Sequence, residues 1–267
     1  MVTMESRVVD VRGPEDITFR IRVHQAGNGP DLLFLHGAGG LLQDDPFLAA
    51  LAQRYRVHAP LLPGYGDSEG AEHLRDMLDV TLHAFDVWRT LGLERPLVVG
   101  HSMGGMIAAE MAAIAPDAVE RLALICPAGL WLDSHPVADI FAALPFELPG
   151  LLFHDPAKNG HLLSAGGDLN DPEFLTDFLV GNARRLGMAG KLLFPIPDRG
   201  LGKRLYRIRA RTAVIWGDGD RLIDPVYADE FVRRIPGASL RRVPAAGHMV
   251  QYEQPDAVLA AIASLHN

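Results

Sequence analysis

The chain has 267 residues, a formal charge of -8 and 48% hydrophobic residues. This length can bury the core of one globular domain, with or without an inserted segment, and the hydrophobic content excludes extended disorder. The acidic balance leaves no overall basic field to attract nucleic acid or an anionic membrane, so a small-molecule substrate is the expected partner.

The number of cysteines and the N-terminal residues indicate the cellular compartment. The single cysteine, Cys126, excludes an internal disulfide and a Cys-based zinc site. The first ten residues lack the apolar segment of a signal peptide, and no apolar run approaches the ~18 residues of a membrane span. We expect a cytoplasmic protein without a membrane partner, and the sequence does not decide between a monomer and a homodimer.

The predicted elements begin with two strands, at residues 6–11 and 17–27, whose alternating pattern indicates an antiparallel pair. The strands that follow are continuous apolar runs, as expected of strands buried on both faces. They are expected within residues 31–40, 55–60, 96–102 and 121–126. Helical patterns separate them, at residues 46–54, 74–93 and 104–115, and Pro116 ends the third of these.

Residues 129–205 break this alternation, and seven of the 19 prolines lie there, between short helical segments. Strand and helix then alternate again through residues 211–265. The pattern predicts an α/β fold with a mostly parallel sheet of about eight strands and helices on both faces. Residues 1–128 and 206–267 would form this core, and residues 129–205 a helical cap inserted after the sixth strand.

A candidate nucleophile lies in the stretch "LVVGHSMGG". Residues 100–104 fit the pattern GxSxG between a predicted strand and a predicted helix, with Ser102 at the centre. Glycines two positions before and after the serine relieve crowding in such a tight turn. The backbone N-H of Met103, at the helix N-terminus, would face developing negative charge. The alternative is a serine that merely caps the helix.

The second candidate segment is "LHGAGG", which directly follows a buried strand. A backbone N-H in such a loop can complete an oxyanion hole, and we assign Ala38 as this donor. A dinucleotide-binding fingerprint is the competing interpretation, but GxGxxG fails because Leu42 replaces the third glycine. We expect His36 to be structural, held by the backbone of nearby loops.

The general base is expected at His248, which lies in a loop after the last predicted strand. His101 is a poor candidate because the residue before such a serine points away from it. The acid is expected in "WGDGDRLIDP", which contains Asp218, Asp220 and Asp224. The order Ser, Asp, His is that of a hydrolase triad.

Taken in order, "HGAGG", "PGYGDS", "GHSMGG", "GDGD" and "AGHMVQYEQP" give the chain a resemblance to the α/β-hydrolase superfamily over essentially its whole length. It is most similar to the capped group of carboxylesterases, lactonases and C-C hydrolases of aromatic ring cleavage. The resemblance implies a Ser-His-Asp triad, two backbone oxyanion donors and no cofactor. It also favours Asp220 as the acid, with Asp133 as a remote alternative. One departure is Leu61, where many relatives carry Asp.

A metal site is not expected, because the histidines show no HExxH spacing and no dense cluster with acids. Cys126 is predicted to be a buried strand residue.

The predicted cap is rich in phenylalanine, with six of the 11 in the chain between residues 131 and 205. These side chains either line an apolar pocket over Ser102 or simply dock the cap on the core. Pocket candidates are Leu130, Trp131, Phe141 and Phe146. Nine of the 25 basic residues lie between Arg184 and Arg211, either as a solvated face or with one of them binding a substrate carboxylate.

The leading functional hypothesis is a serine hydrolase that cleaves carboxylic esters of small, largely apolar substrates through an acyl-enzyme. A C-C hydrolase for ring-fission products, or a lactonase, would use the same residues. A non-catalytic binding module on this fold is the third hypothesis.

Overall fold

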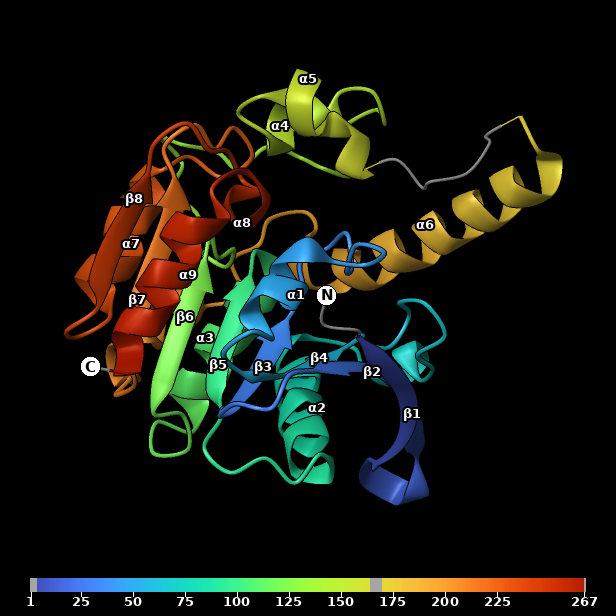
Figure 1. The fold of residues 1–267 in the computed structure, drawn as a ribbon, viewed down its shortest axis with the longest axis horizontal. Helices are drawn as coiled ribbons and strands as arrows, with labels where there is room; N and C mark the ends of the chain where they lie inside the picture. Colours follow the sequence, from blue (N-terminus) through green and yellow to red (C-terminus); the bar gives the residue numbers. More distant parts are fainter. Residues whose placement is uncertain (1–3, 164–169, 267) are drawn as a thin grey trace.

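The computed structural model describes residues 4–163 and 170–266. Within them lies an eight-stranded sheet in the order β1-β2-β4-β3-β5-β6-β7-β8 (Figure 1). The strands are β1 Glu5–Arg12, β2 Thr18–Ala26, β3 Asp31–Leu35, β4 Arg56–Pro60, β5 Leu97–His101, β6 Arg121–Ile125, β7 Arg211–Gly217 and β8 Ser239–Val243. β2 pairs antiparallel with β1 and β4, and the other neighbours are parallel. The predicted sheet is confirmed.

Helices cover both faces of this sheet (Figure 1). On one side α8 contacts α1 and α9, and on the other α2 contacts α3. The α-helices are α1 Pro46–Leu51, α2 Met77–Thr90, α3 Met103–Ile114, α4 Leu148–Leu152, α5 Pro156–Asn159, α6 Pro172–Leu193, α7 Val226–Arg234, α8 Val250–Glu253 and α9 Pro255–Ala263. Single 3-10 turns are η1 Pro14–Asp16, η2 Ala71–His73, η3 Gly160–Leu163, η4 Leu201–Lys203, η5 Leu205–Arg207 and η6 Ser264–His266.

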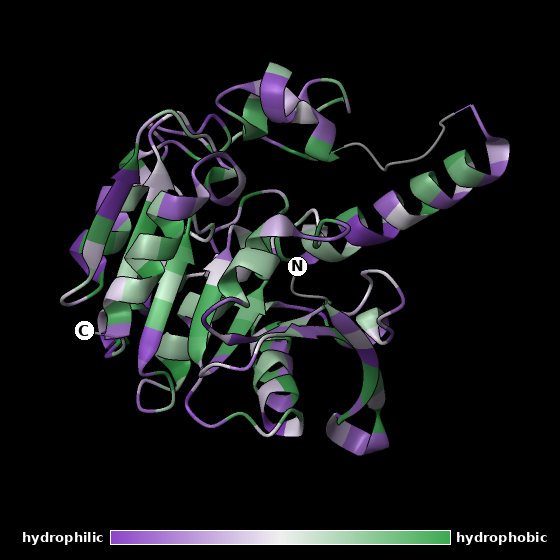
Figure 2. Ribbon diagram, viewed as in Figure 1, coloured by the Kyte–Doolittle hydropathy of each residue, from purple (hydrophilic) through white to green (hydrophobic). Residues whose placement is uncertain are grey.

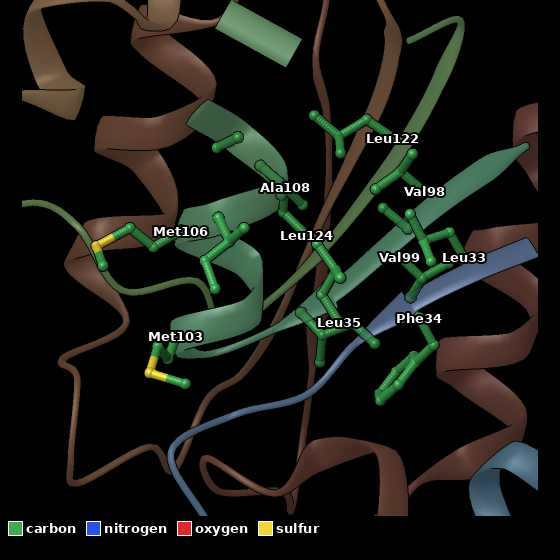
Figure 3. Close-up of a cluster of buried hydrophobic side chains, with 14 of the residues drawn as sticks. Leu33, Phe34, Leu35, Val98, Val99, Met103, Met106, Ala108, Leu122 and Leu124 are labelled. Carbon is green, nitrogen blue, oxygen red and sulfur yellow. The ribbon is translucent and has the colours of Figure 1, made fainter. Parts of the chain in front are cut away.

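The central strands are apolar on both faces because helices remove both from water. Figure 2 shows the apolar residues concentrated in these strands and in α3. Figure 3 shows α3 beside β3, β5 and β6: Ala108 lies on the side of the helix that faces the strands, and Met103 and Met106 point away from them. The alanines and glycines of α3 leave little side-chain volume between the helix and the sheet. The core therefore fixes the start of α3, where Ser102 lies.

Local sequence signals explain several helix starts. Asp45 precedes Pro46 and accepts hydrogen bonds from the backbone N-H groups of Phe47 and Leu48, at 2.9 and 3.1 Å. Asp76 caps α2 in the same way. Such caps satisfy N-H groups that have no partner inside the helix.

The segment between β6 and β7, called the cap below, carries α4, α5, η3 and α6 (Figure 1). Residues 164–169 of the predicted cap lie outside the described residues. Its last part belongs with the core, since Leu201 and Leu205 are fully buried and η5 contacts α3. The boundaries at residues 129 and 205 remain a prediction.

None of the described helices is both long enough and apolar enough to cross a lipid bilayer.

Candidate active site

Ser102 occupies a strained turn between β5 and α3. Its backbone has φ 53° and ψ -116°, a conformation that residues other than glycine rarely adopt. A Cβ at Gly104 would lie 2.0 Å from the carbonyl oxygen of Leu35, so only glycine allows this close approach. The Ser102 side chain makes no capping hydrogen bond to α3. The alternative of a helix-capping serine is therefore wrong, and the strain marks a candidate functional position.

The turn is held by main-chain hydrogen bonds on both sides of Ser102. Its N-H donates to the carbonyl of Ile125 at 2.9 Å, and its own carbonyl accepts from Met106 and Ala128, each at 3.0 Å. Met103 is the first residue of α3, so its N-H has no partner within the helix. This N-H is free of intrahelical bonding at the position expected for an oxyanion donor.

His248 is paired with Asp220. Nδ1 of His248 donates to Oδ2 of Asp220 at 2.8 Å, and both side chains are almost fully buried. The other carboxylate oxygen of Asp220 accepts from the backbone N-H groups of Leu222 and Ile223, each at 2.9 Å. These bonds fix the carboxylate and leave the proton of the neutral imidazole on Nδ1. Nε2 of His248 is then the basic nitrogen, and it has no hydrogen-bond partner within the described residues.

The other acids considered from the sequence lie elsewhere. Asp218 forms an ion pair with Arg242 at 3.6 Å. Asp224 accepts from the N-H of Val226 at 2.9 Å, at the start of α7. Asp133 accepts from the indole N-H of Trp131 at 2.9 Å. Of these candidates, Asp220 is the one that the structure brings to His248.

The loop that carries His248, residues 244–249 between β8 and α8, is called the histidine loop and lies beside the serine turn. His101, the residue before Ser102, donates from Nε2 to the carbonyl oxygen of His248 at 3.0 Å, and the two rings are 5.1 Å apart. Burial lowers the pKa of His101 to about 3, so this ring is neutral. His101 therefore holds the backbone of the histidine loop instead of serving as a base.

The loop "HGAGG" contacts Ser102 from the other side. A Cβ at Gly37 would lie 3.3 Å from Cβ of Ser102. The loop folds back on itself through a bond from the Gly40 N-H to the Gly37 carbonyl at 3.0 Å. Tyr65 donates its hydroxyl to the carbonyl of Ala38 at 3.0 Å. The turn that carries the predicted donor Ala38 is thus fixed beside the serine.

His36 is bonded to backbone groups of this loop region, in the way expected from the sequence. Its Nε2 accepts from the N-H of Leu62 at 3.0 Å, and its Nδ1 donates to the Gly37 carbonyl at 2.8 Å. Burial lowers the pKa of His36 to about 4, which keeps the ring neutral.

A largely apolar pocket lies next to Ser102 beneath the cap. Ser102 and Ala128 contribute from the core, Trp131 and Phe141 from the segment after β6, and Asp139 is the charged side chain among the lining residues. The remaining lining residues are Val137, Ala138, Ile140, Leu193, Pro195, Pro197, Leu222 and Ile223. Two of the predicted pocket residues, Trp131 and Phe141, are in this lining.

The other two predicted pocket residues require correction. Phe146 is 77% exposed and is not part of this lining. Leu130 is buried, but its side chain is directed toward η4, where its Cδ2 would lie 3.2 Å from a Cβ at Gly202. Phenylalanine content predicts apolar surface in this segment, whereas the face on which each residue lies depends on short irregular segments without helical periodicity.

One carboxylate ties the cap to the histidine loop. Glu253, in α8, accepts from the backbone N-H of Gly247 at 2.6 Å and from those of His154 and Asp155, each at 3.1 Å. The N-H of Met249 also donates to a cap carbonyl, that of Leu152, at 3.0 Å. The residues on both sides of His248 are therefore bonded to the cap or to Glu253.

Comparisons with known proteins identify the family of the chain. The model of the Alpha/beta hydrolase family matches residues 32–261. The chain belongs to this family. A relative from Comamonas testosteroni, 2-hydroxy-6-oxononadienedioate/2-hydroxy-6-oxononatrienedioate hydrolase, is 30% identical over 90% of this chain and 88% of its own.

Two further similarities extend this finding. The 2-hydroxy-6-oxo-6-phenylhexa-2,4-dienoate hydrolase of Burkholderia cepacia is 29% identical, over 90% of this α/β hydrolase and 88% of its own length. A solved membrane phospholipase A superimposes with a TM-score of 0.78 at 24% identity, over 99% of this chain and 87% of its own. At that identity the likeness shows the fold alone.

Sequence reasoning missed three residues of this α/β hydrolase site: His101 as a bond to the histidine loop, Glu253 as its link to the cap, and Cys126. The Cys126 side chain lies with those of Asp220 and His248, their ligand atoms all within 4.8 Å of one another. The stretch "GHMVQYE" offered a signal for Glu253, an acid five residues after the expected base. The place of Cys126 depends on strand pairing, which the local sequence does not show.

Proposed function

We propose that this chain is a serine hydrolase that cleaves carboxylic ester bonds of small, largely apolar substrates. The observation that carries the proposal is the buried Asp220 and His248 pair, whose unpartnered Nε2 lies in a site shared with the strained Ser102 turn. A buried polar atom without a partner is costly to keep, and proton transfer to and from a bound substrate would use it.

In this mechanism Nε2 of His248 takes the hydroxyl proton of Ser102 as the serine oxygen attacks the substrate carbonyl. The negative charge that develops on the carbonyl oxygen is stabilised by the N-H groups of Ala38 and Met103. His248 then donates the proton to the leaving alcohol, which leaves an acyl-enzyme. A water molecule, deprotonated by His248, releases the acid and restores Ser102.

Asp220 acts through His248. Its Oδ2 accepts a hydrogen bond from the Nδ1-H of His248, so that Nε2 remains the proton acceptor, and its negative charge stabilises the imidazolium that forms during attack. The apolar lining formed by Trp131, Phe141 and their neighbours favours an aliphatic or aromatic acyl group beside Ser102.

A second candidate is a C-C hydrolase for ring-fission products that carry a carboxylate. Arg185 supports it, because a Cβ at Gly40 would lie 3.9 Å from Cδ of Arg185, which places this cation over the "HGAGG" loop. Burial raises the pKa of Tyr65, which fixes the same loop, and the charge of Arg185 opposes this rise. A substrate could then place an apolar group under the cap and a carboxylate near Arg185. The names of the two hydrolase relatives agree with this arrangement.

The test begins with a fluorophosphonate probe on the purified protein, followed by assays with short and long acyl esters, lactones and a ring-fission dienoate. Probe modification is expected at Ser102, and Ser102→Ala should lose labelling and reduce turnover by orders of magnitude. Ser134→Ala, at an exposed serine, is the matched control. Labelling at another residue would refute the assignment of Ser102.

Arg185 separates the two candidate substrates. If the dienoate is the substrate, Arg185→Gln should raise its KM about tenfold or more, because one charged hydrogen bond contributes roughly 1.5–3 kcal/mol. Ester KM values should stay unchanged, and Arg184→Gln, at the exposed neighbouring position, is the control. Equal effects of both variants would argue against a carboxylate site at Arg185.

A further inference from the structure

Cys126 is a buried side chain that the mechanism above does not use. It directly follows β6, is fully buried, and has its Sγ within 4.8 Å of a carboxylate oxygen of Asp220 and a ring nitrogen of His248. Its own N-H donates to the carbonyl of Ile215 in β7 at 2.9 Å. The pairing of β6 with β7 thus brings the cysteine to the acid that follows β7.

The backbone at Cys126 is strained. Its φ is 41°, in the left-handed region where glycine costs nothing and a residue with Cβ costs about 1 kcal/mol or more. Strain of this kind persists where the surroundings fix it and is common at functional sites. The strain therefore indicates that the contacts of the Cys126 side chain matter for the site.

The Cys126 thiol lies near the Asp220 carboxylate as a neutral group. Burial and the nearby Asp220 charge raise the pKa of the Cys126 thiol well above its usual range, so the thiol keeps its proton. A neutral thiol has one S-H to donate, and an ionised carboxylate can only accept. Asp220 accepts in addition from the N-H groups of Leu222 and Ile223 and from Nδ1 of His248.

Metal binding is a different use of the same three side chains, which together offer one thiol, one carboxylate and one imidazole. In this structure, however, the Asp220 oxygens and Nδ1 of His248 are committed to hydrogen bonds with each other and with the backbone. The geometry is that of a hydrogen-bonded cluster.

We propose that Cys126 is a positioning residue for the hydrolytic reaction: its thiol donates to the Asp220 carboxylate and holds it against Nδ1 of His248. This inference rests on the proposed function. The thiol would fix the orientation of the buried carboxylate toward the imidazole ring.

The experiment measures the rate of fluorophosphonate labelling of Ser102 from pH 5 to pH 9 in the full chain. The variants are Cys126→Ser, which keeps a donor, Cys126→Ala, which loses it, and Cys126→Gly, which loses it and relieves the strain. In the Ala and Gly variants labelling at pH 7 should slow about tenfold, the effect of roughly 1.4 kcal/mol. Cys126→Ser should remain within about twofold of the wild type.

The melting temperature of each variant separates positioning from packing. A structural role alone would lower the melting temperature of Cys126→Ala and leave its labelling profile unchanged, which would overturn the inference. Cys126→Ser labelling as slowly as Cys126→Ala would also overturn it. If the wild type is not labelled at Ser102 at all, the proposed function fails and this inference with it.

Discussion

Exchange of Asp220 for asparagine tests the proposed triad most directly, because it changes one atom in a fixed environment. Oδ1 of Asp220 is held by the N-H groups of Leu222 and Ile223, and an asparagine oxygen would keep these two bonds. The asparagine NH2 would then face Nδ1 of His248, where Oδ2 now accepts a hydrogen bond at 2.8 Å. A donor opposite Nδ1 shifts the imidazole proton to Nε2. Nε2 can then no longer accept the hydroxyl proton of Ser102.

The expected loss in kcat is about ten-thousandfold, by analogy with the same exchange in serine-protease triads. At 1.36 kcal/mol for each factor of ten, this is about 5 kcal/mol of transition-state stabilisation. The assay is ester turnover together with the rate of fluorophosphonate labelling, and the melting temperature reports the fold.

Asp218→Asn and Asp224→Asn are the matched controls. Asp218 pairs with Arg242 at 3.6 Å with both side chains more than a third exposed, so little activity or stability should be lost. Asp224→Asn can still accept from the Val226 N-H and should cost mainly stability. Full activity of Asp220→Asn together with loss of activity in Asp224→Asn would refute the assignment.

The remaining predictions concern the cap, metals and pH. Phe141→Ala should raise the rate on long acyl esters relative to short ones, because it widens the pocket beside Ser102. Phe146→Ala, at an exposed position, is the control. Equal ratios of long-ester to short-ester rates in the two variants would contradict a pocket role for Phe141. Activity should survive EDTA, and its loss with restoration by zinc would require another mechanism. Burial lowers the pKa of His83 to about 4, so the unfolded chain binds the proton first and the free energy of unfolding should fall between about pH 6.5 and pH 4. In denaturant titrations His83→Phe should flatten this slope, and an unchanged slope would assign it to other groups.

The sheet and the serine turn could be predicted because their signals are local. Continuous apolar runs predict strands buried on both faces. The glycines two positions before and after Ser102 predict a tight turn that leaves no room for a Cβ at those two positions. The resemblance to the α/β hydrolases favours Asp220 over its neighbours, because of its place between Gly217 and Pro225. Each of these inferences needs only the order of residues in one short stretch.

The contacts around the site needed the tertiary structure. Cys126 meets Asp220 because β6 pairs with β7 in a register that places Ile125 opposite Ile215. Phe146 and Leu130 were misplaced because residues 129–147 contain no described helix or strand. Without a period of 3.6 or 2, composition gives the amount of apolar surface and not its direction.

The Glu253 bonds have a consequence for protein engineering. The cap and the last helical segments are joined at the histidine loop, and a Cβ at Gly247 would lie 2.7 Å from the cap nitrogen of His154. In a chimaera whose cap comes from another enzyme, the main-chain groups of that cap would meet a histidine loop of different sequence. Such a chimaera should therefore also take the segment that corresponds to residues 245–255 from the enzyme that supplies the cap, so that the acid and the glycine at this junction match the new cap.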